Sequence, residues 1–106
     1  MSDGNWIDVC GVNDIEEEDV VRFDHEGKTY AIYRAPGGDF FVTDGLCTHE
    51  RVSLADGLVM DHVIECPKHN GRFDYRTGQA LSGPVCVNLG IYPVRLDGGR
   101  VKVAVS

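Results

Sequence analysis

The residues of this chain with the clearest capacity for chemistry are two cysteines and two histidines in two short segments. Cys47 and His49 stand two positions apart. Sixteen residues separate His49 from Cys66, which is followed three positions later by His69. Together they offer two thiolate sulfurs and two imidazole nitrogens, which are ligand types that suit zinc or an iron–sulfur centre. The sequence therefore predicts a metal site with Cys47, His49, Cys66 and His69 as ligands.

The division of the ligands between the two segments bears on which metal they bind. A zinc finger usually carries both cysteines in one segment and both histidines on a following helix. Here each segment mixes the two types, so two cysteines can converge on one iron and two histidines on the other, as in a [2Fe–2S] cluster with mixed ligands. A structural zinc module and four unliganded core residues are the alternatives.

The stretches around these ligands resemble the two ligand boxes of the Rieske family. CTHE from Cys47 and CPKHNGRFD from Cys66 match in ligand identity, order and gap, and the likeness extends over most of the chain. The resemblance implies a [2Fe–2S] cluster in which Cys47 and Cys66 hold the buried iron, while His49 and His69 bind the other iron and face the surface. A site without an open coordination position does no substrate chemistry, so we expect an electron carrier and not an enzyme.

Within the family, the sequence is similar to ferredoxins of ring-hydroxylating and rhizopine-catabolism systems. The resemblance implies a carrier that takes single electrons from an NAD(P)H-dependent flavoprotein reductase and delivers them to a terminal non-haem iron oxygenase. The chain ends at Ser106 without a mononuclear-iron domain, so it is not expected to be the oxygenase. The small subunit of an assimilatory nitrite reductase is an alternative, disfavoured because those chains often lack the ligands, and a structural zinc module is another.

Four positions near the ligands predict a low reduction potential. The respiratory branch of the family carries two further cysteines that cross-link its boxes, and Val52 and Lys68 stand at those positions. The same branch has a serine and a tyrosine that donate hydrogen bonds to sulfur, where this chain has Gly71 and Phe73. Such hydrogen bonds favour the reduced state, so we predict a potential near the low end of the Rieske range, about −150 mV.

Composition narrows the class of protein. A chain of 106 residues is expected to form one domain, residues 1–106. It has no apolar run near the ~20 residues of a membrane span, and its first residues, MSDGNWIDV, lack the basic and apolar segments of an export signal. We therefore expect a soluble cytoplasmic protein with Cys10 and Cys86 as reduced thiols. Its net charge of −7 disfavours nucleic acid as a partner.

Short runs of β-branched and aromatic residues recur between Gly, Asp and Asn turn signals. They predict an all-β fold of antiparallel strands, with at most one helical turn, at residues 13–19. The strands are expected at residues 6–9, 20–24, 29–34, 40–43, 63–65, 72–75, 91–96 and 101–105. The resemblance adds the Rieske fold: stacked antiparallel sheets with a cluster-binding subdomain inserted at about residues 43–84.

Several segments around the boxes carry separate expectations. Residues 58–65 are predicted to form a hairpin with a solvent-exposed His62 at its turn, and residues 82–84 resemble the proline loop that covers the cluster in this family. The acidic run at residues 16–19 is expected to be a solvated loop. Arg51 and Lys68 lie within the boxes and predict a locally mixed or basic rim for a docking partner.

Overall fold

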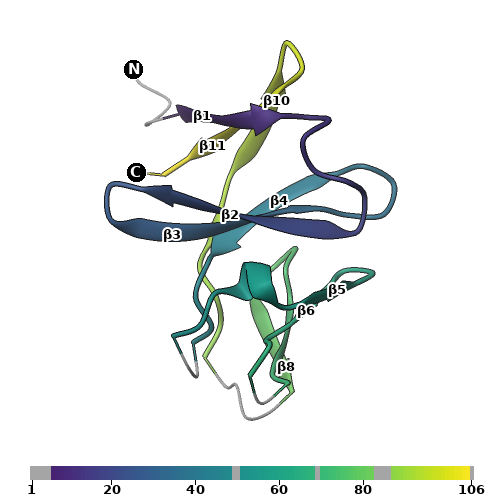
Figure 1. Cartoon of the computed structure of the whole chain (residues 1–106), viewed down its shortest axis with the longest axis vertical. Helices are drawn as coiled ribbons and strands as arrows, with labels where there is room; N and C mark the ends of the chain where they lie inside the picture. Colours follow the sequence, from purple (N-terminus) through teal and green to yellow (C-terminus); the bar gives the residue numbers. More distant parts are fainter. Residues whose placement is uncertain (1–5, 49–50, 69, 83–86, 106) are drawn as a thin grey trace.

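The strands of the chain form three antiparallel sheets stacked along the long axis of the molecule (Figure 1). The computed structural model describes residues 6–48, 51–68, 70–82 and 87–105. The prediction of an all-β fold of antiparallel strands is confirmed. Within these ranges, no helix is long and apolar enough to cross a membrane.

The strand orders of the three sheets are β1-β11-β10, β2-β3-β4-β9 and β5-β6-β7-β8. The first sheet joins the two ends of the chain (Figure 1). The first box lies between β4 and β5, and the second box lies between β6 and β7 of the third sheet. The bounds are β1 Trp6–Gly11, β2 Asp19–His25, β3 Lys28–Arg34, β4 Phe40–Asp44, β5 Leu58–Met60, β6 Val63–Glu65, β7 Arg72–Asp74, β8 Gln79–Ser82, β9 Ile91–Tyr92, β10 Val94–Asp97 and β11 Arg100–Ala104.

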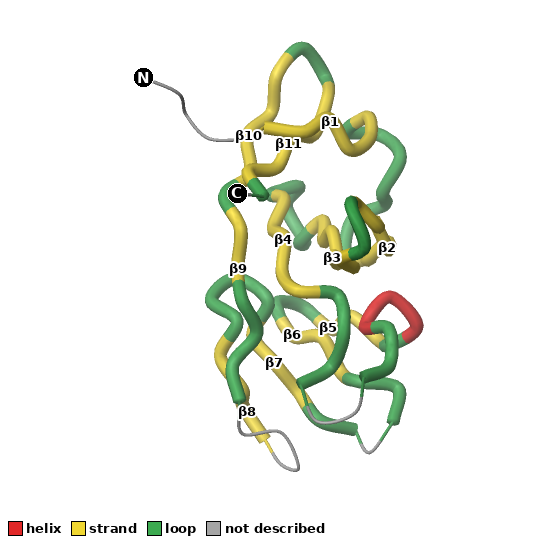
Figure 2. The backbone as a smooth tube through the Cα atoms, turned by 90° about the vertical axis from the view of Figure 1, so that its left-hand side faces the viewer, coloured by secondary structure: helices red, strands yellow, loops and turns green. Residues whose placement is uncertain are grey.

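Strand β3 is buried on both faces because it lies between two hydrophobic cores. Successive side chains of a strand point to opposite faces of its sheet. Tyr30 and Ile32 accordingly join the core shared with β1 and β11, whereas Ala31 and Tyr33 join the core shared with the third sheet. The second sheet is therefore the middle layer of the molecule, as the side view also shows (Figure 2).

The predicted hairpin at residues 58–65 is confirmed as β5 and β6, which pair from Leu58 with Glu65 to Met60 with Val63. Asp61 begins its turn with a φ of 57°. The expectation of an exposed His62 was wrong: its side chain is only 31% exposed, and its ring centroid lies 6.1 Å from that of Tyr75.

The helical turn expected at residues 13–19 was also wrong, since this segment contains no helix. Ile15 is buried, and its carbonyl accepts a hydrogen bond from Nη1 of Arg34 at 3.0 Å. Glu17 and Glu18 accept backbone N–H groups of Gly37 at 3.1 Å and of Asp61 at 2.6 Å. The acidic run is therefore more than a solvated loop, because two of its carboxylates bind distant turns.

Two further differences concern strand limits. Residues 91–96 divide at Pro93, which has no N–H to donate to a sheet, so β9 pairs with β4 and β10 pairs with β11. Strand β8 was not predicted, because its sequence, QALS, has little β-branched or aromatic character. The short helix within the described ranges is a 3₁₀ turn at Leu54–Asp56.

Candidate metal centre

The first box lies on a loop that leaves the end of β4 and folds back on itself. Leu46 and Ser53 form an antiparallel bridge, and the N–H of Cys47 donates to the carbonyl of Val52 at 2.9 Å. Gly45 opens the loop, and a Cβ there would lie 2.7 Å from the carbonyl carbon of Tyr30, so only glycine fits this close crossing. These contacts hold Cys47 at a fixed place with only 2% of its surface exposed.

The second box connects β6 to β7. The N–H of Cys66 donates to the carbonyl of Gly71 at 2.7 Å, directly beyond the paired residues Glu65 and Arg72. Asn70 takes a φ of 58°, a conformation that asparagine tolerates better than most residues. The loop is thus a tight connection within the third sheet, and it leaves Cys66 only 1% exposed.

Cys47 and Cys66 belong to the same buried cluster, together with Leu54, Ile64 and Phe73. The structure therefore brings together two of the four predicted ligands, on two loops at one end of the molecule (Figure 1). His49 and His69 lie outside the described residues, so their part in the site stays a prediction. Two buried thiols in one apolar cluster are a donor set that fits an iron–sulfur centre, because such centres are held by cysteine thiolates.

A third segment, which follows β8 in the chain, contacts the first box. The hydroxyl of Thr48 donates to the carbonyl of Val87 at 2.8 Å, linking residues 39 positions apart. Val87 follows the predicted lid segment, of which Gly83 and Pro84 lie outside the described residues, as does Cys86. The lid role stays a prediction, but the chain beyond it is tied to the first box.

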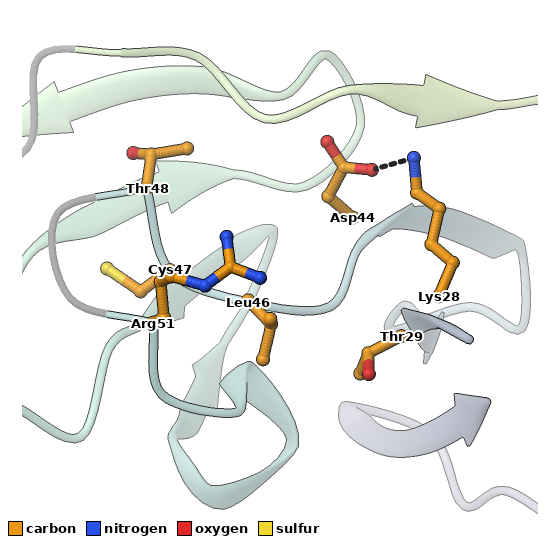
Figure 3. Close-up of a pocket in the computed structure, with 7 residues that line it drawn as sticks. All are labelled: Lys28, Thr29, Asp44, Leu46, Cys47, Thr48 and Arg51. Carbon is orange, nitrogen blue, oxygen red and sulfur yellow. Dashed lines mark ion pairs between the residues drawn. The ribbon is translucent and has the colours of Figure 1, made fainter.

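A pocket of about 520 Å³ opens beside Cys47 (Figure 3). Its lining residues are Lys28, Thr29, Asp44, Leu46, Cys47, Thr48 and Arg51. The guanidinium of Arg51 extends into the space near Leu46, and Lys28 reaches toward Asp44 across the opposite side (Figure 3). The surface next to the first ligand loop therefore presents two cations and one carboxylate.

Asp44 is the most densely bonded side chain of this pocket. Its carboxylate accepts hydrogen bonds from the hydroxyl of Tyr92 at 2.5 Å and the N–H of Gly90 at 2.9 Å, and lies 3.2 Å from Nζ of Lys28. Burial would raise the pKa of Asp44, but the hydrogen bonds from Tyr92, Gly90 and Lys28 outweigh burial and lower the pKa below 3.8. Asp44 is therefore a carboxylate at neutral pH.

The same contacts fix the charge of its neighbours. Hydrogen bonding to Tyr92 raises the pKa of Lys28, and the Asp44 carboxylate raises it further against the opposing effect of burial. Burial and the hydrogen bond with Asp44 raise the pKa of Tyr92. The group consists of one anion, one cation and one neutral phenol at physiological pH.

Sequence reasoning assigned no role to Asp44 or Tyr92. Asp44 entered only as one of the Asp and Gly turn signals between predicted strands, and Tyr92 only as part of the predicted strand at residues 91–96. The available signal was an acidic residue three positions before the first cysteine. Its partner lies 48 residues later, so no local pattern pairs the two.

Two buried cysteines on neighbouring loops that cap an antiparallel sheet define a small all-β protein suited to an iron–sulfur centre. The chain belongs to the Rieske [2Fe-2S] domain family, whose sequence profile matches residues 5–93. Its cofactor is a [2Fe–2S] cluster.

Known ferredoxins are similar to this protein over nearly the whole chain. The ferredoxin component of the naphthalene 1,2-dioxygenase system of Pseudomonas aeruginosa is 44% identical over 101 residues, 95% of this chain and 96% of that protein. A structure described as the complex of reduced oxygenase and oxidized ferredoxin in carbazole 1,9a-dioxygenase contains a chain that is 36% identical, with a TM-score of 0.89, covering 92% of this chain and 100% of that one.

A third comparison bears on the fold alone. The putative small subunit of an NADH-dependent nitrite reductase from Mycobacterium tuberculosis has a TM-score of 0.87, covering 99% of this chain and 98% of that one. At 20% identity it shows the shared Rieske architecture and nothing about function.

Proposed function

We propose that this protein is the ferredoxin of a ring-hydroxylating oxygenase system, carrying single electrons from an NAD(P)H-dependent flavoprotein reductase to a terminal non-haem iron oxygenase. The observation that carries the proposal is the 44% identity, over 95% of the chain, to a ferredoxin component of a dioxygenase system. The fold and the paired cysteine loops support it, because they supply the scaffold such a carrier needs.

The proposed ligands are Cys47, His49, Cys66 and His69. Cys47 and Cys66 are buried in one apolar cluster. Each is held by a backbone hydrogen bond across its loop. When bound, a [2Fe–2S] cluster takes up and releases one electron without an open coordination position. The chain's own residues orient the sulfurs and exclude water from them, which keeps the reorganisation around the redox centre small.

The surface around the first box provides a docking rim. Arg51 is exposed, lies at the pocket beside Cys47, and makes no hydrogen bond or ion pair with another residue in the described part of the chain. Lys68 is exposed in the second box. These two cations lie at the ligand end of a protein whose net charge is −7. The electrostatic potential at this end is therefore less negative than a uniform spread of the net charge would give.

The proposed function includes a domain organisation and a cellular location. Residues 1–106 form one Rieske domain in which about 43–84 make up the cluster-binding subdomain. The protein works in the cytoplasm, where the half-buried thiol of Cys10 stays reduced.

The proposal is tested by EPR spectroscopy after dithionite reduction, with assays of iron and acid-labile sulfide. A rhombic spectrum with the low average g value of a histidine-ligated cluster is expected. Cys47→Ser, Cys66→Ser, His49→Ala and His69→Ala should each abolish this spectrum, whereas Cys10→Ser should retain it. Bound zinc without a spectrum would return the chain to the structural-module alternative.

A second assay addresses the direction of electron flow. The purified protein should support turnover of a naphthalene-type terminal oxygenase when NADH and a flavoprotein reductase are supplied. Failure with such oxygenases, together with support of a nitrite reductase large subunit, would favour the nitrite reductase alternative.

A further inference from the structure

We propose that Asp44 is a positioning residue, which clamps the stem of the first ligand loop to residues 90–92. The proposal rests on the proposed function, because these loops are the ones predicted to carry the cluster. Asp44 is the last residue of β4, three positions before Cys47, and both residues line the same pocket.

The clamp joins Asp44 to Gly90 and Tyr92 through both its side chain and its backbone. The carboxylate accepts the N–H of Gly90 at 2.9 Å and the hydroxyl of Tyr92 at 2.5 Å. The N–H of Asp44 donates to the carbonyl of Gly90 at 2.9 Å. Lys28 completes the group with an ion pair at 3.2 Å. Asp44, which leads into the first box, is thus bound to the segment 90–92.

The stem is also held from the core side. The hydroxyl of Thr43 donates to the carbonyl of Asp44 at 2.7 Å, and the hydroxyls of Thr43 and Tyr33 lie 2.9 Å apart. Because Thr43 has one hydroxyl hydrogen, Tyr33 is the donor in the second bond. Tyr33 is fully buried, so the backbone at Asp44 is anchored to the central sheet.

Steric fit and a second tie support the same role. A Cβ at Gly90 would lie 2.7 Å from Oδ2 of Asp44, so a larger residue there would push the carboxylate out of its present place. Beyond Cys47, the hydroxyl of Thr48 binds the carbonyl of Val87 at 2.8 Å. Asp44 and Thr48 therefore tie the first ligand loop to residues 87–90 at positions before and after Cys47.

A positioning role and a purely electrostatic role give different results for two charge variants. If Asp44 and Lys28 acted only through their charges, Asp44→Asn would raise the reduction potential and Lys28→Gln would lower it. If they hold the loops closed, both variants admit water to the site and shift the potential in the same direction. The signs of the two potential shifts therefore distinguish a positioning role from an electrostatic role.

The decisive variant is Tyr92→Phe, which removes one hydroxyl and keeps the ring that packs edge-on against Tyr30 at 5.1 Å. We expect the amide hydrogen of Gly90 to exchange about tenfold faster, and iron to be released to a chelator about tenfold faster, the factor for one lost charge-assisted hydrogen bond. Asp44→Asn should speed amide exchange at Gly90 and iron release in the same way, and it should also change the EPR spectrum. The control is Tyr30→Phe, which removes a hydroxyl from the adjacent ring and should retain wild-type rates.

Wild-type exchange and iron release in both Tyr92→Phe and Asp44→Asn would overturn the proposal. Potential shifts of opposite sign in Asp44→Asn and Lys28→Gln, with unchanged exchange at Gly90, would overturn it in favour of an electrostatic role. If the wild-type protein held no iron, the proposed function would fail, whereas exchange at Gly90 would still decide whether the clamp exists.

Discussion

The ring of Tyr75 lies parallel to the ring of Tyr33, with centroids 4.4 Å apart and 4° between the planes. Tyr33 belongs to β3 in the central sheet, and Tyr75 follows β7 in the sheet that carries the second ligand loop. Both residues are fully buried in the cluster that includes Cys47 and Cys66. The stacked pair therefore joins the scaffold to the layer that positions the proposed ligands.

The hydroxyl of Tyr75 gives the first prediction. It donates to the carbonyl of Asp61 at 2.5 Å, and burial followed by the charge of Asp61 raises the pKa of Tyr75 to about 12, so the phenol stays a donor at neutral pH. Tyr75→Phe should lower the free energy of unfolding by about 1–2 kcal/mol, because a carbonyl loses its partner. Tyr75→Ala should cost about 3–5 kcal/mol through the lost ring. Urea denaturation of the holoprotein measures both, and equal stability of Tyr75→Phe and wild type would contradict the first.

Glu18 supports the turn of the β5–β6 hairpin from a distant loop. Its Oε2 accepts the N–H of Asp61 at 2.6 Å, 43 residues away. Glu18→Ala should destabilise the protein by about 1 kcal/mol and speed exchange of the Asp61 amide hydrogen, since this N–H loses its acceptor. Glu18→Gln keeps an acceptor oxygen and should restore most of the loss.

The matched control for that experiment is Glu16→Ala, which removes an exposed carboxylate of the same acidic run. Glu16 makes no hydrogen bond or ion pair with any residue that the structure describes. Equal effects of the two alanine variants would show that the run acts only through its total charge.

The reduction potential tests the residues after the second cysteine. Phe73 is fully buried in the cluster that contains both cysteines, and Gly71 is also buried. We expect a wild-type potential near −150 mV. Gly71→Ser and Phe73→Tyr should each raise it by about 40 mV where the new hydroxyl donates to sulfur, the equivalent of about 1 kcal/mol for one electron. Protein-film voltammetry measures these values; Phe40→Tyr, the same change on the other side of the central sheet, should leave the potential unchanged.

The acid limb of the stability profile tests Asp44. A carboxyl group with a lowered pKa in the folded state adds stability that is full above its unfolded pKa, near 4, and is lost as pH falls through the folded pKa. Because the side chain is one-third exposed, we discount this contribution to about 1 kcal/mol. The stability difference between wild type and Asp44→Asn should shrink by that amount from pH 6 to pH 3. A difference that stays constant with pH would contradict the assignment.

Charge reversal at the docking rim tests the partner surface. Arg51→Glu should slow electron transfer to the terminal oxygenase about tenfold at low ionic strength, and the difference should fade at high salt. Stopped-flow kinetics measures the rate. Lys102→Glu makes the same charge change on β11, in the sheet farthest from the boxes, and should leave the rate close to wild type. Equal slowing in both variants would assign the effect to net charge alone.

Local signals were enough to predict most of the strands and the two cysteines of the site. The predicted strands at residues 20–24, 29–34 and 40–43 each lie within an observed strand, because alternating apolar residues and turn signals act over a few positions. The hairpin at residues 58–65 was predictable for the same reason. The helical turn at residues 13–19 failed because the burial of Ile15 and bonds to distant turns, not local propensity, shape that segment.

The sequence by itself was enough to propose the ligands of this protein, because the types, order and spacing of Cys47, His49, Cys66 and His69 are properties of the chain and need no fold to be recognised. Only the tertiary structure decided what surrounds them. The contacts of Asp44 with Tyr92, and of Glu18 with Asp61, span 48 and 43 residues. Such pairs form when the packing of three sheets fixes the positions of their strand ends, so no periodicity along the sequence encodes them.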